Sequence, residues 1–177
     1  TCKVISYVQI ILFILLTLFV IHWHVNKSTY DKTTFKPTSH FHSGFSYSVT
    51  EEWTADNKKV PLTIKYITPI SLYSNYLQIS IFLLLIYSCL KEFGNVIRSV
   101  KSRETFHRNN VRSFRKIGKL LLLLFLVSSF SYIGFQQGAY YSFTINFSYI
   151  ILIIITYILG EIFKEGNHLL EENQLTV

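Results

Sequence analysis

The sequence predicts an all-α membrane protein, a four-transmembrane-helix bundle with a small extracytoplasmic β-hairpin-like insertion between the first and second helices. Three observations predict this fold class. Half of the 177 residues are hydrophobic and only 15% are charged, whereas soluble domains average about 25% charged residues. The apolar residues are gathered into four long runs, and all five arginines lie between the second and third runs. The chain, 1–177, is therefore expected to form a single integral membrane domain.

The four apolar runs cover residues 4–22, 70–90, 117–136 and 145–163. A helix of about 20 residues is about 30 Å long, which matches the hydrocarbon core of a bilayer. Because lipid cannot satisfy backbone hydrogen bonds, runs of this length indicate helices. The runs contain no Asp, Glu, Lys or Arg except Lys119 and Glu161, which lie near ends where they can reach the headgroups. A cleaved signal peptide is the alternative for the first run, disfavoured by its length and by the lack of a small-residue cleavage site.

The connection after the second run, 91–116, indicates the orientation. Together with Lys119 it contains nine basic residues against Glu92 and Glu104. Short loops rich in Lys and Arg remain in the cytoplasm. We therefore expect this connection, both termini and the tail 164–177 to be cytoplasmic, and the segment 23–69 to lie outside.

The outer segment shows strand periodicity. Apolar and polar residues alternate over 45–49 and again over 62–66, with a turn-like stretch, 54–59, between them. This pattern predicts that the two stretches pair as a hairpin, with a third strand near 33–36.

The basic connection is expected to be helical where it enters the third run. Arg108, Arg112 and Arg115 recur at intervals of four and three residues, which places them on one helical face. The fourth helix is expected to continue past residue 163. The acidic residues of this helix and its tail could then face the arginines. These acidic residues are Glu161, Glu165, Glu171 and Glu172.

Few residues suggest chemistry. His22, His24, His40 and His42 form two His-x-His pairs, which are weak candidates for a metal site; we expect no bound metal and no cofactor. The polar residues in or beside the runs, among them Asn75, Gln78, Ser80 and Asn146, are expected to bridge helices by hydrogen bonds. The sequence contains no nucleophile–base constellation or phosphate-binding glycine loop, so no enzymatic activity is expected.

The basic connection has three interpretations. It serves as a topology determinant, and at the same time it suits anionic lipid headgroups, at about 1 kcal/mol per basic residue. Direct nucleic-acid binding is not expected, because the connection lacks interleaved aromatic residues beyond Phe106 and Phe114 and has no helix-turn-helix pattern.

Two stretches, "ETFHRNNVRSFRKIG" and "LGEIFKEGNHLLEENQLTV", resemble the bacterial membrane-protein family catalogued as domain of unknown function 2975. The matching positions of the first stretch are Phe106, Asn110, Arg112, Arg115, Ile117 and Gly118. Those of the second are Glu161, Ile162, Phe163, Gly166, Leu170, Glu172, Leu175, Thr176 and Val177.

The resemblance implies a bacterial inner-membrane protein without an established activity. Family members are often encoded beside a small helix-turn-helix regulator, which implies a regulatory partner in the cytoplasm. We therefore expect a non-enzymatic interaction or sensing protein. The expected cytoplasmic site residues are Phe106, Arg108, Asn110, Arg112, Arg115, Gly118, Glu161, Phe163, Gly166 and Glu172. The alternative is a small transporter or channel subunit that uses Gln78 and Asn146.

Overall fold

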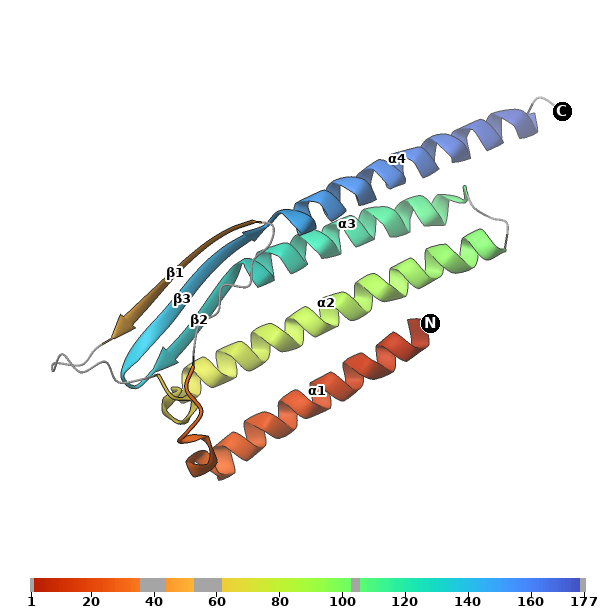
Figure 1. Cartoon of the computed structure of the whole chain (residues 1–177). Coiled ribbons are helices and arrows are strands. Elements are labelled where there is room, and N and C mark those ends of the chain that lie inside the picture. Colours follow the sequence, from red (N-terminus) through yellow and green to blue (C-terminus); the bar gives the residue numbers. More distant parts are fainter. Residues whose placement is uncertain (1, 36–43, 53–61, 103–105, 176–177) are drawn as a thin grey trace.

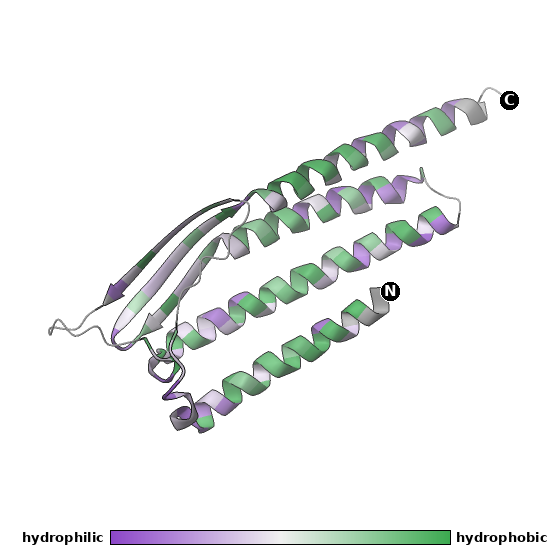
Figure 2. Ribbon diagram, viewed as in Figure 1, coloured by the Kyte–Doolittle hydropathy of each residue, from purple (hydrophilic) through white to green (hydrophobic). Residues whose placement is uncertain are grey.

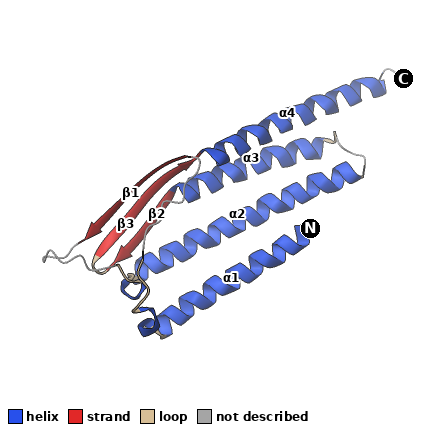
Figure 3. Cartoon of the chain, in the orientation of Figure 1, coloured by secondary structure: helices blue, strands red, loops and turns tan. Residues whose placement is uncertain are grey.

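The computed structural model describes residues 2–35, 44–52, 62–102 and 106–175. Within them lie four long helices and one small sheet, as Figures 1 and 3 show. The helices are α1 (Cys2–Val25), α2 (Pro69–Lys101), α3 (Arg108–Ser129) and α4 (Phe147–Leu175).

The helices lie side by side in chain order, each against the next, so that they form an open row (Figure 1). The expected closed four-helix bundle is therefore not confirmed. The N-terminus, the C-terminus and the α2–α3 connection lie at one end of the row, and the sheet lies at the other. This arrangement agrees with both termini being on the same side as the basic connection.

Three helices are long and apolar enough to cross a membrane, over Tyr7–Val25, Pro69–Lys101 and Phe147–Glu172. Their middle sections are mostly hydrophobic (Figure 2), and many of their apolar side chains are exposed. In α1, the six consecutive apolar residues 10–15 are 41–56% exposed. The helix α3 is not among the three, because its first half carries the basic residues. It is the one helix whose buried and exposed faces differ as in a soluble protein.

The sheet consists of β1 (Gly44–Glu52), β2 (Phe130–Phe135) and β3 (Gly138–Asn146), in the antiparallel order β1-β3-β2. Phe135 pairs with Gly138, so two glutamines form the hairpin loop. The predicted third helix, 117–136, is therefore wrong beyond Ser129, where β2 begins. Aromatic residues favour strands, and a two-residue loop followed by Gly suits a tight hairpin. Counting apolar residues alone cannot separate such strands from a helix.

The predicted insertion is half correct. Residues 45–49 do form a strand, within β1, but this strand pairs with β3 and not with 62–66. The latter stretch contains the short 3₁₀ helix Ile64–Tyr66. The third strand expected near 33–36 is reduced to a single bridge between Thr34 and Thr63. The predicted turn 54–59 lies outside the described residues.

The end of α1 is anchored beneath the sheet by one aromatic residue. Trp23 is fully buried, and its indole Nε1 donates to the carbonyl of Ile64 over 3.0 Å. Nearby, Lys65 Nζ lies 2.6 Å from Asp31 Oδ1, and this hydrogen bond raises the pKa of Lys65 above its ordinary value. The outer segment is thus attached to α1 and to the start of α2.

One face of the sheet carries exposed rings. Tyr47 lies opposite Phe143, and Phe130 lies opposite Phe143 from the other side. Tyr132 lies opposite Tyr141, with ring centroids 5.1 Å apart. Each of these rings is at least 37% exposed. Soluble surfaces rarely gather so much apolar area.

Three polar residues of α2, spaced four and three apart, hydrogen-bond the free edge of β2. These side chains satisfy backbone N–H and C=O groups that are not bonded within the β2–β3 hairpin or within the last turn of α3. The bonds run from Gly134 N to Ser71 Oγ (2.9 Å), from Asn75 Nδ2 to Tyr132 O (2.7 Å), and from Gln78 Nε2 to Val127 O (2.8 Å) and Phe130 O (2.5 Å).

The expectation that polar residues of the apolar runs bridge helices is confirmed for Gln78, which bonds Val127 O of α3. Asn75 instead joins α2 to the strand β2. Ser80 instead bonds within α2, to Tyr76 O. Asn146 accepts a bond from Ser148 N at the start of α4, over 2.9 Å. These last two bonds are local.

Candidate interaction site at the α2–α3–α4 end

The first turns of α3 form the amphipathic extension that the sequence predicts. His107 caps the helix, its Nδ1 accepting from Asn109 N over 3.2 Å. Val111, Phe114 and Ile117 are buried, with exposed fractions of 8%, 6% and 5%. The arginines lie on the opposite, exposed face. The apolar stripe therefore attaches the basic stripe to the row of helices.

Aromatic rings join this extension to α4. The Phe163 ring lies 4.8 Å from that of Phe114 and 5.6 Å from that of Phe106, measured between centroids. A Cβ at Gly166 would overlap the Phe106 ring, and a Cβ at Gly118 would lie 2.9 Å from the ring of Tyr157. Gly166 thus allows the segment before α3 to lie close to α4, and Gly118 allows α3 itself to lie close to α4.

A line of ion pairs crosses the three helices at one level. Arg115 Nη2 lies 3.0 Å from Glu161 Oε1, and Lys164 Nζ lies 3.1 Å from the other oxygen of Glu161. On the α2 side, Lys116 Nζ lies 2.5 Å from Glu92 Oε1. The predicted encounter between the arginines and the acidic residues of α4 is confirmed for Arg115 and Glu161.

Glu92 is the best sheltered of these carboxylates, with 13% of its side chain exposed. It lies beyond the apolar residues 70–90 of α2 and also accepts from Ser113 Oγ over 3.1 Å. The hydrogen bond from Lys116 holds the pKa of Glu92 below its ordinary value, and the Ser113 hydroxyl acts in the same direction. Glu92 is therefore an anion fixed between α2 and α3.

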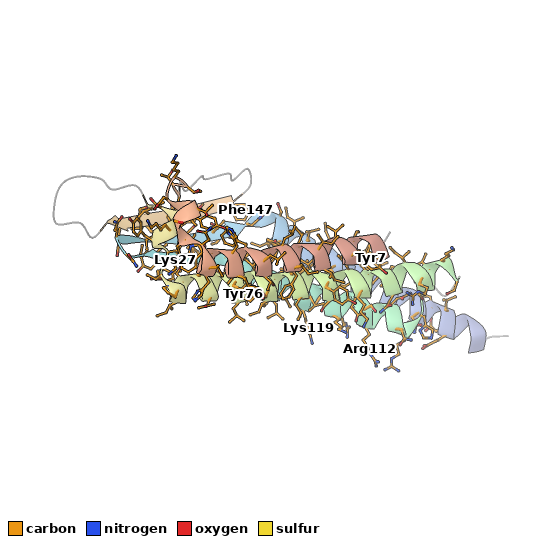
Figure 4. The ribbon with its side chains drawn as sticks, turned by 90° about the horizontal axis from the view of Figure 1, so that it is seen from below. Tyr7, Lys27, Tyr76, Arg112, Lys119 and Phe147 are labelled. Atoms are coloured by element: carbon orange, nitrogen blue, oxygen red, sulfur yellow. The ribbon has the colours of Figure 1, made fainter. Side chains whose placement is uncertain are left out.

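The exposed face of α3 forms a basic groove of about 380 Å³. Figure 4 shows Arg112 and Lys119 projecting from α3 on the same side of the helices. Arg108 and Arg112 have no carboxylate partner within the described ranges. The lining residues are Arg108, Val111, Arg112, Arg115, Lys116 and Lys119.

A second, polar cleft of about 570 Å³ lies between α2 and α3. Asn110, only 2% exposed, forms part of its wall and donates from Nδ2 to Ser99 Oγ over 2.9 Å. The α2 residues of this cleft were not among the expected site residues. A signal was present, because Glu92, Asn95 and Ser99 recur at helical spacing just beyond the apolar run.

A family model described as "Protein of unknown function (DUF2975)" matches residues 46–177. The chain belongs to this family. The matched region begins in β1 and contains the α2–α3–α4 end described above, whereas α1 precedes it. The resemblance predicted from the two terminal stretches is thus confirmed. No curated protein and no solved structure matches the chain.

Six of the family-like positions take part in contacts between α3, the segment before it and α4. Phe106, Phe163 and Gly166 share one contact, Gly118 faces α4, and Arg115 pairs with Glu161. Asn110 instead faces α2. Glu172 lies further along α4, exposed, near His168 (3.5 Å) and away from the aromatic contact.

The first histidine pair, His22 and His24, lies at the end of α1. His22 Nδ1 forms a hydrogen bond with the Tyr30 hydroxyl over 2.8 Å, and the His24 ring lies beside Trp23. His40 and His42 lie outside the described residues. Within the ranges that the structure describes, no three His, Cys, Asp or Glu residues are grouped as a metal would require.

Proposed function

We propose that the chain is an integral membrane protein that crosses the bilayer four times, and that its α2–α3–α4 end is a non-enzymatic interaction or sensing site in the cytoplasm. The exposure of 41–56% along residues 10–15 of α1 supports membrane insertion. Water would make such a surface costly, at about 25 cal/mol per Å² of exposed apolar area, whereas lipid removes that cost.

The third crossing is then half helix and half strand. Residues 117–129 of α3 provide about 20 Å, and the first four residues of β2 add about 13 Å. Together they match the roughly 30 Å of hydrocarbon. A strand at this depth needs its free edge sealed, and the bonds from Ser71, Asn75 and Gln78 do this.

The orientation follows from the basic residues. Positively charged segments beside short apolar spans remain in the cytoplasm, and the basic face of α3 lies at the same end as both termini. In a bacterial inner membrane, a reporter fused after Val177 should then be active only in the cytoplasm. Activity on the outer side alone would overturn this orientation.

The interaction surface is the basic face of α3, fixed against α4. Arg115 is engaged with Glu161, whereas Arg108 and Arg112 have no carboxylate partner in the described part of the chain. These two guanidinium groups are available to acidic groups of a partner or to anionic headgroups. The partner that the family resemblance implies is a small helix-turn-helix regulator.

Retention of that regulator by the detergent-purified chain tests the proposal. Arg108→Ala combined with Arg112→Ala should weaken retention about tenfold or more, because each lost charge-assisted bond is worth about 1.5–3 kcal/mol. The control removes the same charge at the sheet end, with Lys27→Ala and Lys32→Ala. Retention that is unaffected by the arginine changes, or is equally weakened by the lysine changes, would overturn the proposed surface.

The polar side chains on which a transporter would depend, those of Gln78 and Asn146, are already hydrogen-bonded to the backbone. Gln78 bonds the carbonyls at the end of α3, and Asn146 caps the start of α4. Their involvement in backbone hydrogen bonds supports the interaction function over the transport alternative.

A further inference from the structure

The polar cleft between α2 and α3 adjoins the partner surface proposed above and shares Arg112 and Lys116 with it, whereas Arg98 belongs to the cleft alone. Its volume of about 570 Å³ lies within the range of small-molecule sites, about 300–1,000 Å³. Both helices contribute cations to it, Arg98 from α2 and Arg112 and Lys116 from α3. Basic side chains from two helices that line one cleft indicate an anion-binding site more strongly than a basic stripe on one helix does.

The charge of the cleft is unbalanced. Glu92 is the one carboxylate among the described lining residues, and it is already bonded to Lys116 and Ser113. Arg98 and Arg112 have no carboxylate partner among the residues described. The lining therefore presents two uncompensated guanidinium groups.

Neutral donors surround these guanidinium groups. Asn95 and Asn109, whose side-chain amides can donate, line the same cleft. The α3 helix also begins there, at Arg108, and a helix N-terminus adds the positive end of its dipole. The part-buried bond from Asn110 to Ser99 joins the two walls of the cleft. The site is therefore rich in donors and held in place before any ligand arrives.

We infer that this cleft binds a phosphate group. Guanidinium groups bind phosphate through paired N–H bonds, and the side-chain amides supply further donors for its remaining oxygens. Arg98 lies about 9 Å along α2 beyond Glu92, just outside the apolar part of the helix. At that level the phosphate of an anionic lipid headgroup and free phosphate from the cytoplasm can both enter.

The experiment uses the full chain purified in detergent, at constant ionic strength. Inorganic phosphate is titrated by calorimetry, and phosphatidylglycerol is titrated in mixed micelles, with phosphatidylcholine as the neutral comparison and native mass spectrometry as the readout. Arg98→Gln removes a proposed ligand. Lys101→Gln removes the same charge from an exposed position of α2 that does not line the cleft.

Saturable binding of either probe that weakens about tenfold or more in Arg98→Gln, and less than twofold in Lys101→Gln, supports the inference. Which probe binds identifies the source of the phosphate. Asn109→Ala should weaken the same binding to a smaller extent, and it replaces Arg98→Gln if that variant does not fold. Binding of neither probe, or equal losses in the cleft and control variants, would overturn the inference. The result does not depend on whether a protein partner binds.

Discussion

The two ends of α2 carry similar polar residues but use them differently. Near its start, Ser71, Asn75 and Gln78 bond to the backbone of β2 and the end of α3. Near its other end, Asn95 and Arg98 line a cleft open enough to admit a ligand. Both stripes follow helical spacing, and both lie against the α3–β2 segment.

The difference lies in what the neighbouring chain offers. At the first end, that segment has just left its helical hydrogen-bonding pattern, so it presents unsatisfied carbonyls to the amides of α2. At the other end, that segment is the beginning of α3, where the backbone carbonyls are already bonded within the helix. Polar side chains that find no backbone partner remain available to solutes. A polar stripe on one helix is therefore structural or functional according to the element beside it.

Breaking the sealed end should have the largest effect. Replacing Asn75 and Gln78 together by Leu leaves the carbonyls of Val127, Phe130 and Tyr132 without these partners. We expect the free energy of unfolding to fall by about 2–4 kcal/mol, because each unsatisfied buried group costs about 1–3 kcal/mol. Denaturant unfolding in detergent measures it.

The matched control is Asn95→Leu, in the open cleft of the same helix. It should change stability by less than about 0.5 kcal/mol, as expected for a side chain with few structural bonds. Equal losses for the two ends would contradict the division of α2 into a structural and a functional half.

The packing of α3 against α4 provides the second prediction. Gly118→Ala places a Cβ 2.9 Å from the Tyr157 ring, whereas Gly160→Ala places one 3.6 Å from Phe114 Cβ, an ordinary contact. Both changes gain up to about 1 kcal/mol of helix propensity. Only the first is overpacked, so Gly118→Ala should be the less stable variant by about 1–3 kcal/mol. Similar melting temperatures for the two variants would show that the ring moves aside freely.

Sequence periodicity predicted the helical structure at the α2–α3–α4 end well. The basic residues at spacings of four and three, with Val111, Phe114 and Ile117 between them, indicate one amphipathic helix, and the structure contains it. The pairing of Arg115 with Glu161 also followed, because both residues were placed near the same ends of adjacent spans. Local patterns suffice where a contact joins neighbouring helices at a shared level.

The sheet could not be predicted in the same way. β2 continues the apolar run of α3 without a break, so hydropathy alone favours one long helix there. The partner of β1 lies almost 100 residues away, since Ser46 is opposite Thr144. The bonds from Asn75 and Gln78 that stabilise the change from helix to strand join residues 49–57 positions apart in sequence. Each of these features depends on long-range pairing, which local periodicity does not contain.

The smallest expected effect concerns acid stability at the border between the two halves of α2. The pKa of Glu92 is lowered from its ordinary value of 4.5, first by Lys116 and then by Ser113. A carboxyl group whose pKa is lower in the folded protein stabilises the fold above its unfolded-state pKa. That contribution is lost as the pH falls through the folded-state pKa.

Glu92→Gln should therefore lower stability modestly at pH 7 and reduce its decline below about pH 4.5. Thermal unfolding between pH 3 and pH 7, at constant salt, measures the two slopes. Glu165→Gln, which changes an exposed carboxylate of α4, should leave the slope unchanged. If both variants lose acid sensitivity equally, the loss reflects the change in net charge. The contacts of Glu92 with Lys116 and Ser113 would then have no specific part in acid stability.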